Sequence, residues 1–281
     1  MTSAVLAAAL ALALAQSPGA APSPPDAGTT GASVQVAKTA TKEAAFASAV
    51  APPVDKERDV EAVAAAIQRM EKAARALKDF TATFYKKEWK GKQLPEEVIA
   101  LKYRASPRSV YFRWTGDAYQ GQEVLWQKGW NGDKARAHPG SFPDVTVNLP
   151  TGHWLMTRST RHPVPNAGFD FTIAMFARDL VTHQTKPECL VRAVDAGLQV
   201  LYGAQARCFE METDKAKCPE MYSRKARLCI YERLDVPAKI EVWDQEDGAL
   251  RLVEEYGYGD VKLDFGLSDK DFDPANEDYQ F

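Results

Sequence analysis

The sequence lacks every short motif that would mark a familiar catalytic centre. It has no GxSxG, no HExxH, no glycine-rich phosphate loop after a predicted strand and no pair of carboxylates spaced for acid–base chemistry. The net charge of −3 is small and no basic stripe is present, which argues against a nucleic acid partner. We therefore expect a protein that is not an enzyme and that uses no cofactor.

Positive charge is also missing at the start of the chain, where Thr2 to Ala15 form an almost unbroken Ala/Leu/Val run. This run has the length of a signal-peptide core and ends in the small-x-small pattern Ala13-Leu14-Ala15. We expect residues 1–15 to be a signal peptide for export to the periplasm of a Gram-negative-type envelope; the alternative is an uncleaved tail. No Cys follows the run, so we expect no lipid anchor there, and no membrane span after cleavage.

Large apolar side chains are scarce between residues 16 and 54, which are rich in Ala, Pro, Ser, Thr and Gly. Such a segment buries too little surface to offset the entropy of ordering it, so it is expected to be a disordered leader. The remaining chain, residues 55–281, is long enough for one domain with a sizeable core.

Cysteine is rare, and all four thiols fall in one short window: Cys189, Cys208, Cys218 and Cys229. An even number of cysteines in an exported protein predicts two disulfides, with three possible connectivities. We favour Cys189–Cys208 and Cys218–Cys229, because the second bridge would close the loop between two predicted strands. No CxxC is present and the histidines lie elsewhere, so we expect no metal site.

The apolar period changes along the chain. From residue 55 to 80 and again from 167 to 184, apolar residues recur at helical spacing. Elsewhere they alternate between turn formers, which is typical of antiparallel strands. The strands are expected near 80–84, 99–103, 110–114, 123–128, 131–138, 189–194, 198–203, 207–213, 227–234, 238–244 and 249–258. This order predicts an α+β fold: a single large curved antiparallel sheet, with helices against one face.

Three stretches carry a resemblance to a known family: Phe80-TATFYKKEW, Tyr103-RASPRSVYFRW and Glu123-VLWQKGWNGDKARAH. With the preceding helix, they resemble the LolA-like superfamily of outer-membrane lipoprotein carriers. The closer likeness is to an uncharacterised bacterial family within it. That likeness rests on Ser159-TRHP and on the closing Tyr256-x-Tyr-x-Asp-Val-Lys-Leu and Asp271-Phe-Asp-Pro-x-Asn patterns.

The resemblance implies a half-open β-barrel whose apolar concave face is covered by helices and shelters an acyl chain in transit. The expected partner is a lipid or lipoprotein acyl chain, with proteins of the cell envelope as a second class of partner. Six residues are candidates to line the cavity: Phe84, Leu101, Tyr103, Phe112, Trp114 and Trp126. The alternatives are that these are ordinary core residues, or that the fold is an envelope interaction module with a filled interior.

Basic residues gather before the second predicted helix, where His153, Arg158, Arg161 and His162 occur within ten positions. An Arg/His cluster of this kind is suited to an anionic head group. A metal-dependent hydrolase centred on His153 and His162 is a weaker alternative, since the spacing matches no ligand signature. The simplest interpretation is a hydrogen-bonded structural loop.

The C-terminal segment carries three alternating aspartates between residues 269 and 273. A calcium loop requires Gly at its sixth position, where this sequence has Pro274, so turn and capping roles are favoured. We expect Tyr256–Val261 to form the last long strand. The following turn is expected to bring Tyr279 and Phe281 back against the body.

Overall fold

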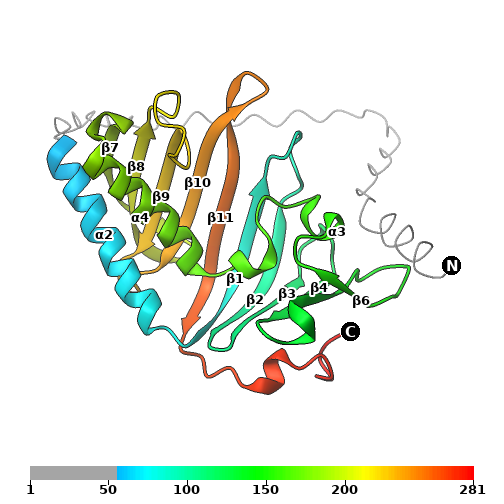
Figure 1. Ribbon diagram of the computed structural model, residues 1–281. Coiled ribbons are helices and arrows are strands. Elements are labelled where there is room, and N and C mark those ends of the chain that lie inside the picture. The colour runs from blue at the N-terminus through cyan, green and yellow to red at the C-terminus, as the bar shows by residue number, and fades with distance from the viewer. Residues whose placement is uncertain (1–55) are drawn as a thin grey trace, which may run out of the picture.

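The computed structural model describes residues 56–281, so the predicted signal peptide and leader lie outside the described residues (Figure 1). Three α-helices are present: α2 (Lys56–Ala76), α3 (Trp154–Thr157) and α4 (Phe169–Thr185). The strands are β1 (Asp79–Glu88), β2 (Glu97–Ala105), β3 (Arg108–Trp114), β4 (Glu123–Gln127), β5 (Lys134–His138), β6 (Val147–Pro150), β7 (Leu190–Leu201), β8 (Ala204–Thr213), β9 (Lys225–Tyr231), β10 (Pro237–Glu246) and β11 (Ala249–Leu263). In this range no helix is both long and apolar enough to cross a bilayer.

All eleven strands join one antiparallel sheet in the order β6-β5-β4-β3-β2-β1-β11-β10-β9-β8-β7. The sheet does not close, which confirms the predicted curved α+β architecture. Two hairpin meanders meet in the centre, where β11 pairs with β1. Between them the chain crosses one face of the sheet through α3 and α4 (Figure 1).

The helices cover one face of the sheet because their apolar stripes match its inward positions. α2 contacts β7 and α4 (Figure 1), and α4 buries Phe169, Ile173 and Phe176. The ring of Phe169 stacks on Phe80 of β1 at a centroid distance of 4.2 Å. The first helix was predicted to reach residue 80 but ends at Ala76, because the apolar residue at 80 belongs to the alternating pattern of β1.

Residues 190–201 form one strand, whereas the sequence predicted two. The break in apolar periodicity is a β-bulge between Asp195 and Gly197, where Gly197 has a positive φ of 78°. The bulge shifts the alternation by one residue without ending the strand. β6 and α3 are too short to leave a periodic signal and were not predicted.

The predicted disulfide pairing is wrong, although all four cysteines are bridged. The bonds are Cys189–Cys218 and Cys208–Cys229. Cys208 and Cys229 lie directly opposite each other on β8 and β9, with Cα atoms 3.9 Å apart. The other bridge ties the start of β7 to the β8–β9 loop. The register between β8 and β9 therefore determines which cysteines are bonded to each other, whereas their distance in sequence does not.

The C-terminal segment returns against the body of the domain, as predicted, and it packs on the face of the sheet opposite the helices. Tyr279 stacks on Tyr111 of β3 at 4.1 Å, and Phe281 meets the same ring edge-on. Ser268 and Asp271 form a capping box, so the alternating aspartates have the predicted capping role.

Two glycines of β11 make room for a tyrosine from the far end of the sheet. Tyr202 follows β7 and stacks on Tyr85 of β1 at 5.0 Å. A Cβ atom at Gly257 would lie 1.8 Å from the Tyr202 hydroxyl oxygen, and one at Gly259 would lie 3.2 Å from Cε2 of Tyr85, the ring on which Tyr202 stacks. The missing side chains let the β7–β8 turn rest against β11.

Replacing Gly257 with Ala should therefore lower the free energy of unfolding by about 1–2 kcal/mol, because the Tyr202 ring must leave its place. Chemical denaturation measures this loss. In the Tyr202→Ala background the same Gly257→Ala change should cost almost nothing, since the clash is gone. Equal costs in both backgrounds would contradict this close packing of Tyr202 on β11.

Candidate functional site

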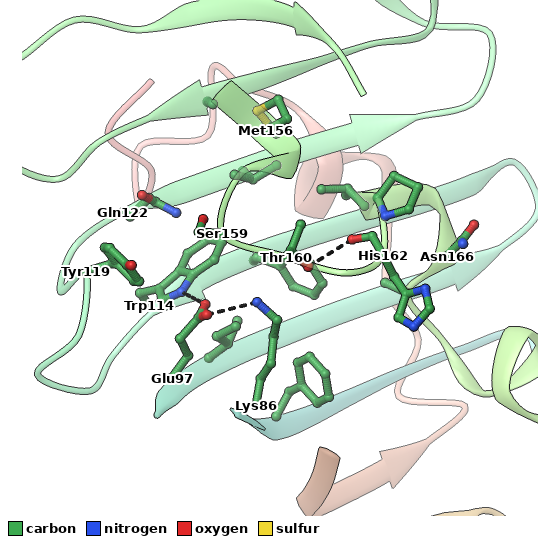
Figure 2. A pocket seen from close by; sticks show the side chains of 18 of the residues that line it. Lys86, Glu97, Trp114, Tyr119, Gln122, Met156, Ser159, Thr160, His162 and Asn166 are labelled. Carbon is green, nitrogen blue, oxygen red and sulfur yellow. Dashed lines mark hydrogen bonds and ion pairs between the residues drawn. The ribbon is translucent and has the colours of Figure 1, made fainter. Parts of the chain in front are cut away.

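A cavity of about 140 Å³ lies between the inner face of β1–β6 and β11 and the segment of residues 153–168, here called the covering segment (Figure 2). The sheet contributes Phe84, Ile99, Phe112, Trp114, Val124, Ala137, Tyr256 and Tyr258 to its wall. The covering segment contributes Leu155, Met156, Ser159, Thr160, His162, Pro163, Val164, Asn166, Ala167 and Gly168.

Half of the six residues predicted to line a cavity do so. Phe84, Phe112 and Trp114 face it. The other three, Leu101, Tyr103 and Trp126, are buried in the main hydrophobic core instead. A ligand role for any of the six stays a prediction.

Charged residues form the floor of the cavity at the ends of β1 and β2. Lys86 on β1 lies directly opposite Glu97 on β2, and its Nζ is 2.8 Å from the Glu97 carboxylate and 3.4 Å from that of Glu88. The indole N–H of Trp114 donates to the other Glu97 oxygen at 2.6 Å (Figure 2). Burial opposes the charge on Lys86, but Glu97 and Glu88 outweigh it and raise the pKa of the ammonium group.

Two buried carboxylates face each other across β1 and β11, where Glu88 pairs in register with Glu254. Like charges in this position destabilise a sheet unless a cation joins them. Each carboxylate has its own cation: the Lys86 Nζ lies 3.4 Å from Glu88, and the Arg161 Nε of the covering segment donates to Glu254 at 3.0 Å. The backbone N–H of Arg161 also donates to Glu88 at 3.0 Å, so this one residue contacts both carboxylates. A second guanidinium nitrogen donates to the Trp89 carbonyl and to Glu246.

His162 extends this network into the cavity. Its Nε2 lies 3.1 Å from both Glu254 and the Tyr222 hydroxyl, which itself donates to Glu254 at 2.5 Å. Burial opposes ionisation of Glu254, but the bonds from His162 and Tyr222 and the charge of Arg161 lower its pKa. Burial and Glu254 raise the pKa of Tyr222, so the phenol keeps its proton.

The covering segment is fixed to the sheet at further points. At its start, the Lys90 ammonium donates to the carbonyls of Thr157 and Thr160. Near its end, Arg108 of β3 donates to the carbonyls of Pro165 and Ala167 at 3.0 Å. The covering segment is therefore a hydrogen-bonded strap without regular structure for most of its length.

The four basic residues proposed for an anionic head group do not form one site. His153 caps α3, where its Nδ1 accepts from the Leu155 N–H. The guanidinium of Arg158 lies over the ring of Trp154. Of the four, only His162 lines the cavity. Among residues 56–281, no three His, Cys, Asp or Glu side chains are grouped to hold a metal ion.

The charged floor was not predicted, although the sequence of β1 carries a signal for it. Lys86 and Glu88 continue the inward alternation of Phe80, Ala82 and Phe84. A strand whose inward face turns from apolar to charged points to a buried polar cluster.

Several solved structures are similar to this chain at low identity. One is a putative outer membrane lipoprotein-sorting protein domain from Vibrio parahaemolyticus, with 13% identity, a TM-score of 0.35 and coverage of 78% of this chain and 97% of that one. Another is the lipoprotein LppX of Mycobacterium tuberculosis, with 11% identity, a TM-score of 0.43 and coverage of 74% and 98%. A third is the MucA/MucB complex of Pseudomonas aeruginosa, with 12% identity, a TM-score of 0.44 and coverage of 75% and 60%. At such scores the matches say nothing about function.

A LolA superfamily protein from Nitrosomonas europaea is also among the similar structures, with 12% identity, a TM-score of 0.29 and coverage of 75% and 97%. No curated protein matches the chain. The family described as "Protein of unknown function (DUF1571)" matches residues 77–281, most of the chain. The chain therefore belongs to this uncharacterised family.

Proposed function

We propose that the protein is an exported binding protein of the cell envelope that shelters the apolar part of a small amphiphile. The observation that carries the proposal is the cavity under the covering segment, whose walls are mostly aromatic and aliphatic. Each methylene that leaves water for such a wall gains about 0.8 kcal/mol. The two disulfides support export to an oxidising compartment such as the periplasm.

The volume limits what the cavity holds while the covering segment stays in place. Pockets for small molecules commonly measure roughly 300–1,000 Å³, whereas this cavity measures about 140 Å³. Leu155, Met156 and Val164 of the covering segment occupy part of the concave face. An apolar cavity of about 150 Å³ holds one benzene molecule, so roughly six carbons fit here. A full lipoprotein acyl chain requires the covering segment to move.

Benzene is accordingly the simplest probe of the proposal. We expect it to bind the protein purified without its leader and to shift the NMR signals of residues that line the cavity. Ala137→Leu, which fills the cavity from β5, should weaken benzene binding at least tenfold, the equivalent of about 1.4 kcal/mol. Ala204→Leu, at an exposed position on β8, is the matched control and should leave binding unchanged.

Native mass spectrometry followed by organic extraction of the same protein would identify a natural ligand. Absence of both a co-purifying ligand and benzene binding would rule the proposal out. The remaining candidate would then be an interaction module that uses β7. This strand lies at the edge of the sheet and exposes Val191, Leu198 and Val200, so an extended partner could pair with it.

Hydrolysis is the least supported function. His162 and Glu254 form a hydrogen-bonded pair at the cavity, as a hydrolase would require. Within residues 56–281, however, no Ser, Thr or Cys side chain hydrogen-bonds to the His162 ring. The pair instead hydrogen-bonds to Tyr222, and Glu254 also binds Arg161 of the covering segment.

A further inference from the structure

We propose that the cavity selects amphiphiles whose polar end is uncharged and donates hydrogen bonds, and that it rejects carboxylate and phosphate head groups. This inference rests on the proposed function and concerns the same cavity. It follows from the charges that line the cavity and from the polar atoms left without partners.

Every basic side chain on the cavity wall is already held by a carboxylate. Lys86 lies between Glu97 and Glu88. His162 is bonded to Glu254, and the Nε2 of His138 lies 2.6 Å from Asp144. At Lys86 and His162, an anionic head group would have to displace a buried carboxylate. Only the Asp144 partner of His138 is exposed to solvent.

The balance of buried charge is also unfavourable to an anion. Glu88, Glu97 and Glu254 are each at most 3% exposed, and the permanent cations that touch them are Lys86 and Arg161. Adding a further negative charge to this low-dielectric region costs several kcal/mol in desolvation and repulsion. Arg161 was a candidate for head-group binding, but its donors bind Glu254, Glu246 and a backbone carbonyl, and it does not line the cavity.

One end of the cavity offers acceptors. The side-chain carbonyl oxygen of Gln122 is buried and has no hydrogen-bond partner. Gln122 lines the cavity beside Tyr119, and its backbone is joined to Tyr119 and Trp114 (Figure 2). The Glu97 carboxylate, which can accept up to four bonds, lies at this end with two donors in place.

A short-chain alcohol satisfies both requirements. Its alkyl chain of about six carbons fills the apolar part, and its hydroxyl donates to Gln122 or Glu97. A carboxylate of the same length brings only acceptors and a negative charge to the same place. The cavity should therefore bind the alcohol more tightly than the carboxylate of the same chain length.

The test compares 1-hexanol with hexanoate at pH 8, by calorimetric titration of the folded protein. We expect 1-hexanol to bind at least tenfold more tightly. Gln122→Leu should weaken 1-hexanol about fivefold, since one hydrogen bond is lost. Gln245→Leu, at an exposed position on β10, is the control and should have no effect.

Gln122→Lys provides the converse test, because it replaces the acceptor with a cation at this end of the cavity and should shift the preference toward hexanoate. Equal or tighter binding of hexanoate to the unmodified protein would overturn this inference while leaving the proposed function intact. If neither compound nor benzene binds, the proposed function itself fails. If benzene binds and Gln122→Leu leaves 1-hexanol unaffected, the assigned acceptor is wrong.

Discussion

Lys86→Met is expected to lower the free energy of unfolding by about 3–5 kcal/mol, because it leaves two buried carboxylates without their cation. Methionine keeps the length of the side chain but removes its charge. Glu97 and Glu88 would then remain buried without the cation that lies 2.8 Å and 3.4 Å from them. Urea denaturation at pH 7.5 measures the loss.

The loss should shrink at alkaline pH, where Lys86 of the wild type gives up its proton. In the wild type, the raised pKa of Lys86 means that its contribution is complete at neutral pH and fades only above about pH 10.

Lys87→Met serves as the matched control, because Lys87 follows in the same strand and points to the other side of the sheet. Its loss should stay within about 0.5 kcal/mol. Similar losses for both variants would mean that side-chain packing, and not the ion cluster, accounts for the contribution of Lys86 to the free energy of unfolding.

The main elements of the fold could be predicted from the sequence because they depend on local apolar periodicity. The helix at 169–185 and the strands around residues 80, 101 and 112 carry that pattern in their own residues. The prediction of two strands in place of β7 was wrong, because a bulge at Asp195 shifts the apolar alternation by one residue within a single strand. A single inserted residue is not distinguishable from a turn by pattern alone.

Long-range pairing could not be predicted in the same way. Cys208 meets Cys229, and Glu88 meets Glu254, because of the register between strands that are distant in sequence. Four cysteines permit three pairings, and periodicity does not choose among them. Alternation does indicate that Lys86, Glu88 and Glu97 point inward. It does not show that Arg161, from an irregular segment, lies between two of the carboxylates.

Arg161 leads to the second large effect, which concerns its partner Glu254. Glu254→Gln should lower the free energy of unfolding by about 3 kcal/mol. The carboxylate is 3% exposed and receives hydrogen bonds from Arg161, His162 and Tyr222. The amide offers one acceptor in place of two, and it presents its own N–H groups to these donors.

This substitution should also loosen the covering segment. Arg161 would keep its bonds to Glu88 and Glu246 but lose the buried carboxylate that its Nε donates to. We expect amide hydrogen exchange to accelerate across residues 157–163, while the β8–β9 pairing, which contains a disulfide, stays protected. Uniform acceleration over the whole domain would show that Glu254 supports global stability only.

The pH dependence of the Glu254 variant distinguishes charge from packing. Because the pKa of Glu254 is lowered in the folded protein, its contribution is present at neutral pH and is lost as the pH falls through that lowered value. The difference between wild type and Glu254→Gln should therefore narrow below about pH 4. Glu255→Gln, whose partner Lys239 lies at 2.8 Å on the more exposed face, should cost less than about 1 kcal/mol. A gap that stays constant down to pH 3 would assign the loss to the shape of the side chain, and the covering segment would then be held by Glu88 and Lys90 without a buried charge pair at Glu254.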